Sequence, residues 1–155
     1  MNWYSLYKKA SIELYHGSRS GIEERLSSVG PRYWIHLGTQ EQASHFYTTG
    51  IVERIEFSPT KVAIATADCN WDYPIEALNA ISRNVLPATE QGYWDLLERI
   101  EKMGVEEGRE HLVGELTSLG YDAIAYPNEV EGHGYSYTTW KPEIIKKIPD
   151  NGLKS

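Results

Sequence analysis

Two histidines in the first quarter of the chain stand where short apolar segments end. Gly17 follows His16 directly, and Gly38 follows His36 after one intervening residue. Each glycine is followed by a residue with a hydroxyl group. An imidazole can bind a ligand hydroxyl and titrates near neutral pH, while glycine lets a ligand approach the backbone closely. The repeated pattern therefore predicts one cleft with a histidine from each of two strands at its edge.

Each of these side chains also has a plain structural interpretation. A histidine at the end of a strand can simply pack against its neighbours, and His36 follows closely after the two aromatic residues Tyr33 and Trp34. Thr39 is favoured as the N-cap of a following helix over a ligand contact, because its hydroxyl precedes a helical segment. The residue types alone leave both interpretations open.

Hydrophobic periodicity places strands at both ends of the chain and helices between them. Apolar and polar residues alternate over Ile51–Ser58, as in a strand with one buried face, whereas Tyr93, Leu96 and Ile100 recur at helical spacing. The expected strands are Ile12–His16, Tyr33–Leu37, Ile51–Ser58, Val62–Ala67, Tyr121–Tyr126 and Tyr135–Trp140; the expected helices are Ile22–Val29, Gln40–Tyr47 and two apolar stripes, from Tyr93 to Met103 and from Leu112 to Leu119. This order predicts an α+β fold in a single domain over 1–155.

Composition narrows the class of protein. A chain of 155 residues with 41% apolar content can bury a core, so a disordered chain is not expected. A single cysteine, Cys69, excludes an internal disulfide framework and fits a reducing compartment. No segment approaches the ~20 apolar residues that span a bilayer, and the N-terminus lacks the apolar run of a signal peptide. We therefore expect a cytoplasmic protein with no membrane partner.

The charge is acidic and uneven. The formal net charge is −7, but residues 1–34 carry +2 and the remainder −9. Affinity for nucleic acid depends on neutralising phosphates, so an acidic chain is a poor general nucleic-acid binder. A locally positive N-terminal part could hold a small phosphate-bearing molecule, with Arg19 a candidate contact. The alternative is that these charges are simply solvated.

The C-terminal third completes a set of three motifs. Leu119-Gly120-Tyr121-Asp122-Ala123-Ile124-Ala125-Tyr126 precedes an acidic loop, and Gly134-Tyr135-Ser136-Tyr137 begins the next strand, followed by Pro142-Glu143-Ile144-Ile145. This end resembles that of ADP-ribosyltransferase-fold domains of phage, polyvalent and toxin proteins. Tyr15-His16-Gly17-Ser18 resembles the first motif of the histidine branch of that family, and Tyr33–Thr39 with Ala43 resembles the second. The resemblance covers residues 12–48 and 116–147 and implies split mixed and antiparallel β-sheets flanked by helices.

The resemblance also implies NAD as the ligand and a role for each motif. His16 would bind the ribose on the adenosine side, and Gly17 would let the backbone pair with the nicotinamide amide. His36 would lie on nicotinamide, where the family usually has a tyrosine. Ser18, Arg19 and Tyr47 complete the expected cofactor-binding set, with Arg19 at the pyrophosphate and Tyr47 in the nicotinamide pocket or the core.

The third motif departs from the family. The family's catalytic glutamate aligns near Ser136, which cannot supply charge, so we assign the carboxylate to Glu131 in the preceding loop, with Glu129 as the weaker candidate. The expected catalytic set is thus Glu131, His36 and Ser136. Negative charge near the ribose would stabilise the oxocarbenium-like state through which nicotinamide departs.

These features predict a mono-ADP-ribosyltransferase that moves ADP-ribose from NAD to a macromolecule, as a phage effector or a bacterial toxin or defence protein. A protein acceptor is favoured over a nucleic acid. Other outcomes stay open: an NAD glycohydrolase or an RNA 2′-phosphotransferase on the same fold, or a non-catalytic protein-binding module. No metal is expected, because the spacings of the histidines match no zinc pattern and Cys69 stands alone.

Overall fold

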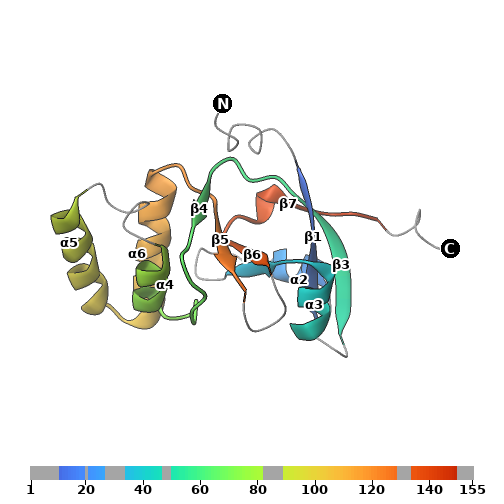
Figure 1. The fold of residues 1–155 in the computed structure, drawn as a ribbon, viewed down its shortest axis with the longest axis horizontal. Helices are drawn as coiled ribbons and strands as arrows, with labels where there is room; N and C mark the ends of the chain where they lie inside the picture. Colours follow the sequence, from blue (N-terminus) through green and yellow to red (C-terminus); the bar gives the residue numbers. More distant parts are fainter. Residues whose placement is uncertain are drawn as a thin grey trace.

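The computed structural model describes residues 11–19, 21–26, 34–46, 50–81, 89–128 and 134–149. The fold is α+β, with two sheets, one antiparallel and one mixed, and helices placed mainly between the early and late strands along the chain. Figure 1 shows a helical bundle at one end of the molecule and the strands of one sheet at the other. The split sheets predicted from the sequence are therefore present.

The first sheet is antiparallel and has the order β1-β3-β7. It contains β1 (Ile12–Ser18), β3 (Ile51–Phe57) and β7 (Ile145–Lys147). The register pairs Ile12 with Phe57 and Ser18 with Ile51. Alternate residues of β3 are buried, as its apolar–polar alternation predicts, except that Ile51 at the strand end is exposed.

The second sheet is mixed and has the order β2-β6-β5-β4. It contains β2 (Ile35–Leu37), β6 (Tyr135–Thr139), β5 (Ala123–Pro127) and β4 (Val62–Ile64), and only β4 pairs in parallel, with β5. Four consecutive residues of β5 are buried. Both faces of this central strand are covered, which explains its nearly continuous apolar sequence.

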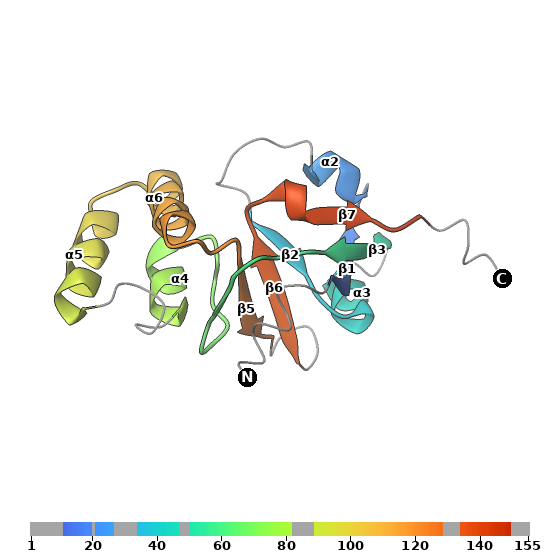
Figure 2. The same ribbon diagram turned by 90° about the horizontal axis from the view of Figure 1, so that it is seen from above.

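Three helices form a bundle on one side of the second sheet, with α5 the farthest from it. They are α4 (Pro74–Ile81), α5 (Glu90–Glu101) and α6 (Val105–Ser118), and both ribbon views place them together on the side away from the first sheet (Figures 1 and 2). Their apolar faces form the larger core with residues such as Ile124 and Tyr126. Gly120, with φ of 91°, follows the end of α6, as predicted.

A second, smaller core joins the two sheets. Its members come from β1, β2, β3, β5 and β7 and from the short helix α2 (Ile22–Leu26); they are Leu14, Ile22, Ile35, Leu37, Ile55, Phe57, Ala123 and Ile145. Helix α3 (Gln40–Phe46) packs against β1 and β3. Neighbouring residues of β5 thus face different cores, because Ala123 belongs to the smaller one and Ile124 to the larger.

The predicted elements differ from the structure mainly at their ends. The strand expected over Val62–Ala67 ends at Ile64, and the structure has a further helix, α4, that begins at Pro74. Leu119, the last residue of the predicted apolar stripe, is 42% exposed because it lies beyond the end of α6. Trp71 anchors the 68–74 loop, since its ring is buried and its Nε1 donates to Asp68. Among the helices described, none has the length and apolar character needed to cross a bilayer.

Candidate active site

The two sheets meet at one isolated backbone bridge. The N–H of Tyr15 donates to the carbonyl of Gly38 at 2.8 Å, and the N–H of Gly38 donates back to Tyr15 at 3.0 Å. In an antiparallel arrangement, alternate residues point their N–H and C=O groups towards the same neighbour. Gly17 therefore points its peptide groups towards β2, where the register of the bridge places His36 opposite, but no ladder continues there between the described residues.

Helix α3 lies directly against this edge of β1. A Cβ at position 17 would fall well inside van der Waals contact of the backbone carbonyl oxygen of Ala43. Only glycine fits under the helix at this point without a shift of the backbone. The first histidine motif thus has a packing reason for its glycine, and the approach of a ligand at this point stays a prediction.

The first turn of α3 is capped by its own side chains. The Thr39 hydroxyl accepts from the N–H of Gln42 at 3.1 Å, and Gln42 Oε1 accepts from the N–H of Thr39 at 2.9 Å. This reciprocal pair is a capping box. Thr39 therefore acts as the predicted helix cap, and the pair fixes the direction in which α3 leaves Gly38.

His36 is exposed and lies on the same face of the sheet as Tyr126. Its Nδ1 is 2.9 Å from the Tyr126 hydroxyl, and the two rings meet edge to face at 5.9 Å. Its neighbours Ile35 and Leu37 point into the smaller core instead. The second predicted histidine is thus held in a defined orientation at the surface, beside the line where the sheets separate.

His16 lies on the opposite face. It is buried, shares its face of β1 with Leu14, and is directly opposite Glu53 in the β1–β3 register. Since Leu14, Ile35 and Leu37 all belong to the smaller core, His16 and His36 leave the sheets on opposite sides. The expectation that both imidazoles face a common cleft was wrong; it is the Gly17 backbone, and not the His16 ring, that the register places opposite His36.

Glu53 is a buried carboxylate that the sequence analysis did not single out as functional. Its Oε1 accepts from the N–H of Ile22 at 2.7 Å, at the start of α2, and its Oε2 forms an ion pair with Lys147 at 3.0 Å. It joins β3, α2 and β7 beside His16. The available signal was a glutamate on the buried face of an alternating strand, where a charge needs a partner.

Ser136 is buried at the third motif and bonds to two other buried side chains. Its hydroxyl donates to Gln42 Oε1 at 2.8 Å and accepts from Asn128 Nδ2 at 2.9 Å. It also lies next to Gly38, where a Cβ would be 3.1 Å from Ser136 Oγ. The third motif therefore meets the second motif around Gly38, on the same face as His36.

The other predicted site residues divide into two groups. Ser18 Oγ accepts from the N–H of Gly21 at 2.8 Å and so closes the turn into α2, and Arg19 is exposed. Tyr47, Glu129 and Glu131 lie outside the described residues. The structure describes the base of the loop that carries the two glutamates. There the N–H of Asn128 donates to the carbonyl of Gly134 at 2.9 Å.

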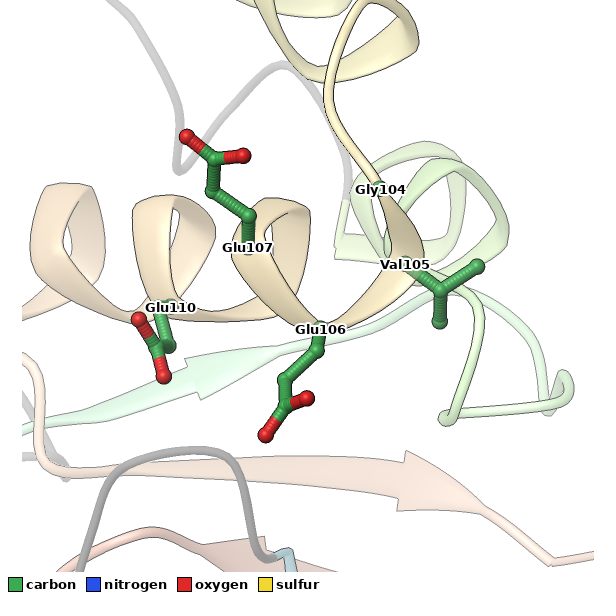
Figure 3. A pocket seen from close by; sticks show the side chains of 5 residues that line it. All are labelled: Gly104, Val105, Glu106, Glu107 and Glu110. Atoms are coloured by element: carbon green, nitrogen blue, oxygen red, sulfur yellow. The ribbon is translucent and has the colours of Figure 1, made fainter.

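A surface hollow at the start of α6 lies apart from the three motifs. It is lined by Gly104, Val105, Glu106, Glu107 and Glu110 in the first turns of that helix (Figure 3). Three carboxylates would repel the pyrophosphate of a dinucleotide. In the part of the chain that the structure describes, no cluster of histidine, cysteine and acidic residues is arranged to hold a metal ion.

Comparison with known proteins gives little beyond this geometry. No protein-family profile matches the chain, and no curated protein matches it. A solved structure described as the crystal structure of an anti-CRISPR protein aligns with 91% of this chain and 98% of its own, at 20% identity and a TM-score of 0.44.

Proposed function

We propose that this protein is a mono-ADP-ribosyltransferase that uses NAD and acts on a macromolecular acceptor in the cytoplasm. The observation that supports the proposal is the meeting of three distant motifs around Gly38. Gly38 forms the bridge between the sheets with Tyr15, and Ser136 lies beside Gly38. Gly17 is two residues beyond Tyr15 on β1, and His36 lies across the split from it.

The Gly17 backbone suits the amide end of nicotinamide. A carboxamide needs one donor and one acceptor in the same plane, and a peptide edge that points out of a sheet offers both. His36, held by Tyr126, would flank the same ligand. The charge that develops on the ribose needs a carboxylate, for which Glu131 is our candidate.

The reaction requires little acid catalysis. The bond from C1′ of the ribose to the pyridinium nitrogen breaks, and its electron pair neutralises the departing nicotinamide. The acceptor nucleophile bonds to C1′ and loses its proton to the carboxylate. The protein's task is to hold the dinucleotide bent and to shield C1′ from water until the acceptor arrives.

The test is incubation of the purified protein with a lysate and NAD labelled in its adenylate part. We expect transfer of label to a macromolecule together with release of nicotinamide. The variant Glu131→Gln should lower nicotinamide release by about 10²-fold or more, as expected for a lost catalytic carboxylate, whereas Glu129→Gln should stay close to wild type. Free ADP-ribose with no labelled acceptor would favour the NAD glycohydrolase instead, and no nicotinamide release would contradict both.

One observation favours a second candidate, a non-catalytic protein-binding module. Ser136 stands where the family has its catalytic glutamate, and its hydroxyl is engaged with Gln42 and Asn128. A ligand that binds only the folded state increases the free energy of unfolding, by about 2.7 kcal/mol when its concentration is 100 times Kd. The melting temperature therefore rises. A melting temperature that does not change with millimolar NAD would support the binding module and count against the enzyme.

A further inference from the structure

Three buried polar side chains form a directional hydrogen-bond chain beneath the start of α3. Asn128 Nδ2 donates to Ser136 Oγ at 2.9 Å, and Ser136 Oγ donates in turn to Gln42 Oε1 at 2.8 Å, which also accepts from the N–H of Thr39. Ser136 is 2% exposed, and Gln42 and Asn128 are each 4% exposed. These hydrogen bonds link three segments that are far apart in the sequence.

A hydroxyl is the group that this position requires. The oxygen between Asn128 and Gln42 must accept from an amide N–H on one side and donate to an amide oxygen on the other. Alanine at position 136 could do neither and would leave two buried polar groups without this partner. Leaving such groups unmatched is costly, and the bonds in a complete chain reinforce one another.

The two ends of the hydrogen-bond chain are attached to backbone that borders the candidate site. At one end, Gln42 accepts from the N–H of Thr39, the residue after Gly38. Ala43, which follows Gln42 in α3, has its carbonyl against Gly17. At the other end, Asn128 also bonds through its N–H to Gly134 and so closes the β5–β6 hairpin. A change at Ser136 would therefore reach both α3 and the hairpin base.

We propose that Ser136 is a positioning residue that couples α3 to the β5–β6 hairpin and so holds α3 at the distance from Gly17 that nicotinamide binding requires. Ser136 does not touch the reacting atoms; it acts through Gln42 and α3. The effect on NAD rests on the proposed function, whereas the coupling between the two backbone segments does not.

The coupling is tested by amide hydrogen exchange measured by NMR on the full chain. In Ser136→Ala, the N–H groups of Thr39 and Asn128 should both exchange at least about 10-fold faster, because the two are linked through the missing hydroxyl. The matched control is Thr139→Val, three residues along β6. It also removes a buried hydroxyl, which donates to the Asp122 carbonyl at 2.6 Å, but it leaves the hydrogen bonds of Ser136 intact.

The effect on NAD is tested by steady-state release of nicotinamide. Ser136→Ala and Gln42→Leu should raise KM for NAD about 10-fold while kcat changes about 3-fold or less, the pattern of lost ground-state positioning. Gln42→Glu retains an acceptor for Thr39 and Ser136 and suits the first turn of a helix, so it should restore KM towards wild type. Thr139→Val should lose stability without this change in KM.

The outcomes separate the two proposals. If Thr39 and Asn128 exchange no faster in Ser136→Ala than in Thr139→Val, the coupling is wrong. If they do exchange faster but KM follows stability in all four variants, Ser136 is structural and its positioning role is overturned. If the wild-type protein releases no nicotinamide, the proposed function fails with the NAD part of this inference, and hydrogen exchange still decides whether the coupling exists.

Discussion

At the scale of single residues, the candidate site depends on a position without a side chain as well as on the side chains around it. Gly17 has no Cβ, and this lets the Ala43 carbonyl of α3 approach the strand. The two histidines that first drew attention to the motifs have different surroundings, because His16 is buried beside Glu53 and His36 is exposed beside Tyr126. In the proposed function the ligand contact therefore falls to the Gly17 backbone and not to the His16 ring.

Gly17→Ala should destabilise the protein. The added methyl group has to displace the backbone of α3, and overpacking of this kind costs about 1–3 kcal/mol. The measurement is the free energy of unfolding in urea. Gly114→Ala is the matched control, because position 114 lies in α6 with open space around its Cα, and alanine in a helix should stabilise by about 0.5–1 kcal/mol. Equal effects of the two substitutions would contradict the close contact at Gly17.

Cys69 should react slowly with thiol reagents. Burial, together with the charges of Asp68 and Glu76, raises the pKa of its thiol to about 12. Only the thiolate is nucleophilic, so at pH 8 the folded protein should react about 10³-fold more slowly than an unperturbed thiol. The check is the rate of alkylation in native buffer and in urea. Because the raised pKa keeps the thiol neutral in the folded state, stability should fall as the pH rises above the unfolded pKa of about 8.5, and Cys69→Ser should lessen that fall.

At the scale of elements, Glu53 connects three segments, β3, α2 and β7. It satisfies the first N–H of α2 and pairs with Lys147 of β7 while it lies in β3. A buried carboxylate is costly to disturb, since the buried N–H of Ile22 is then left without a charged acceptor. Glu53 thus links the start of α2 to β7.

Glu53→Gln should therefore cost about 1–3 kcal/mol, because the charged hydrogen bond to Ile22 weakens and Lys147 loses the nearer of its two carboxylate partners, Glu53 at 3.0 Å rather than Glu23 at 3.9 Å. The control is Glu56→Gln, three residues along the same strand. Glu56 Oε1 accepts from the exposed Ser11 hydroxyl, on the opposite face of β3 from Glu53, so its loss should cost less than about 0.5 kcal/mol. Urea unfolding of both variants provides the comparison, and a cost at Glu53 no greater than that at Glu56 would contradict this role.

Local pattern was enough to predict most elements, but not how they meet. Alternation over Ile51–Phe57 and the capping residue Thr39 are read from neighbours in the sequence, and both were predicted correctly. The face on which His16 lies depends on its register with Glu53 and on the Tyr15–Gly38 bridge, which are contacts between distant segments. No local pattern encodes such a register, so the convergence of the two histidines was wrongly predicted.

The same reasoning explains the other parts of the site that the sequence did not provide. Gln42 was overlooked because its value lies in a contact with Ser136, 94 residues away. Ser136 itself was singled out by family resemblance, and the structure adds its two buried partners. The roles of Glu131 and Tyr47 remain predictions, and the test with labelled NAD addresses the first.

At the scale of the whole molecule, two cores share one strand. Ile124 of β5 faces the larger core, while Ala123 beside it faces the smaller core that also contains Ile55. The helical end and the sheet junction are therefore joined through the middle of the second sheet (Figure 2). A disturbance in either core should reach the other through β5.

Ile55→Ala and Ile124→Ala test this connection. Each deletes a fully buried side chain and should cost about 2–5 kcal/mol. If the cores unfold together, calorimetry of both variants should show one transition whose measured enthalpy equals the van't Hoff enthalpy. Two separate transitions in Ile55→Ala, with the upper one at the wild-type temperature, would show that the helical end unfolds independently.

The aromatic ring beside His36 has an optical consequence. Tyr126, which bonds to His36, lies 5.0 Å from the ring of Trp71, and Trp71 in turn lies 6.2 Å from Trp34, which meets Trp140 at 5.8 Å. These three buried indoles form a continuous path from the interior to the one exposed imidazole at the split. Their ultraviolet emission should therefore report a molecule bound against His36, so that occupancy can be followed without a dye or a label.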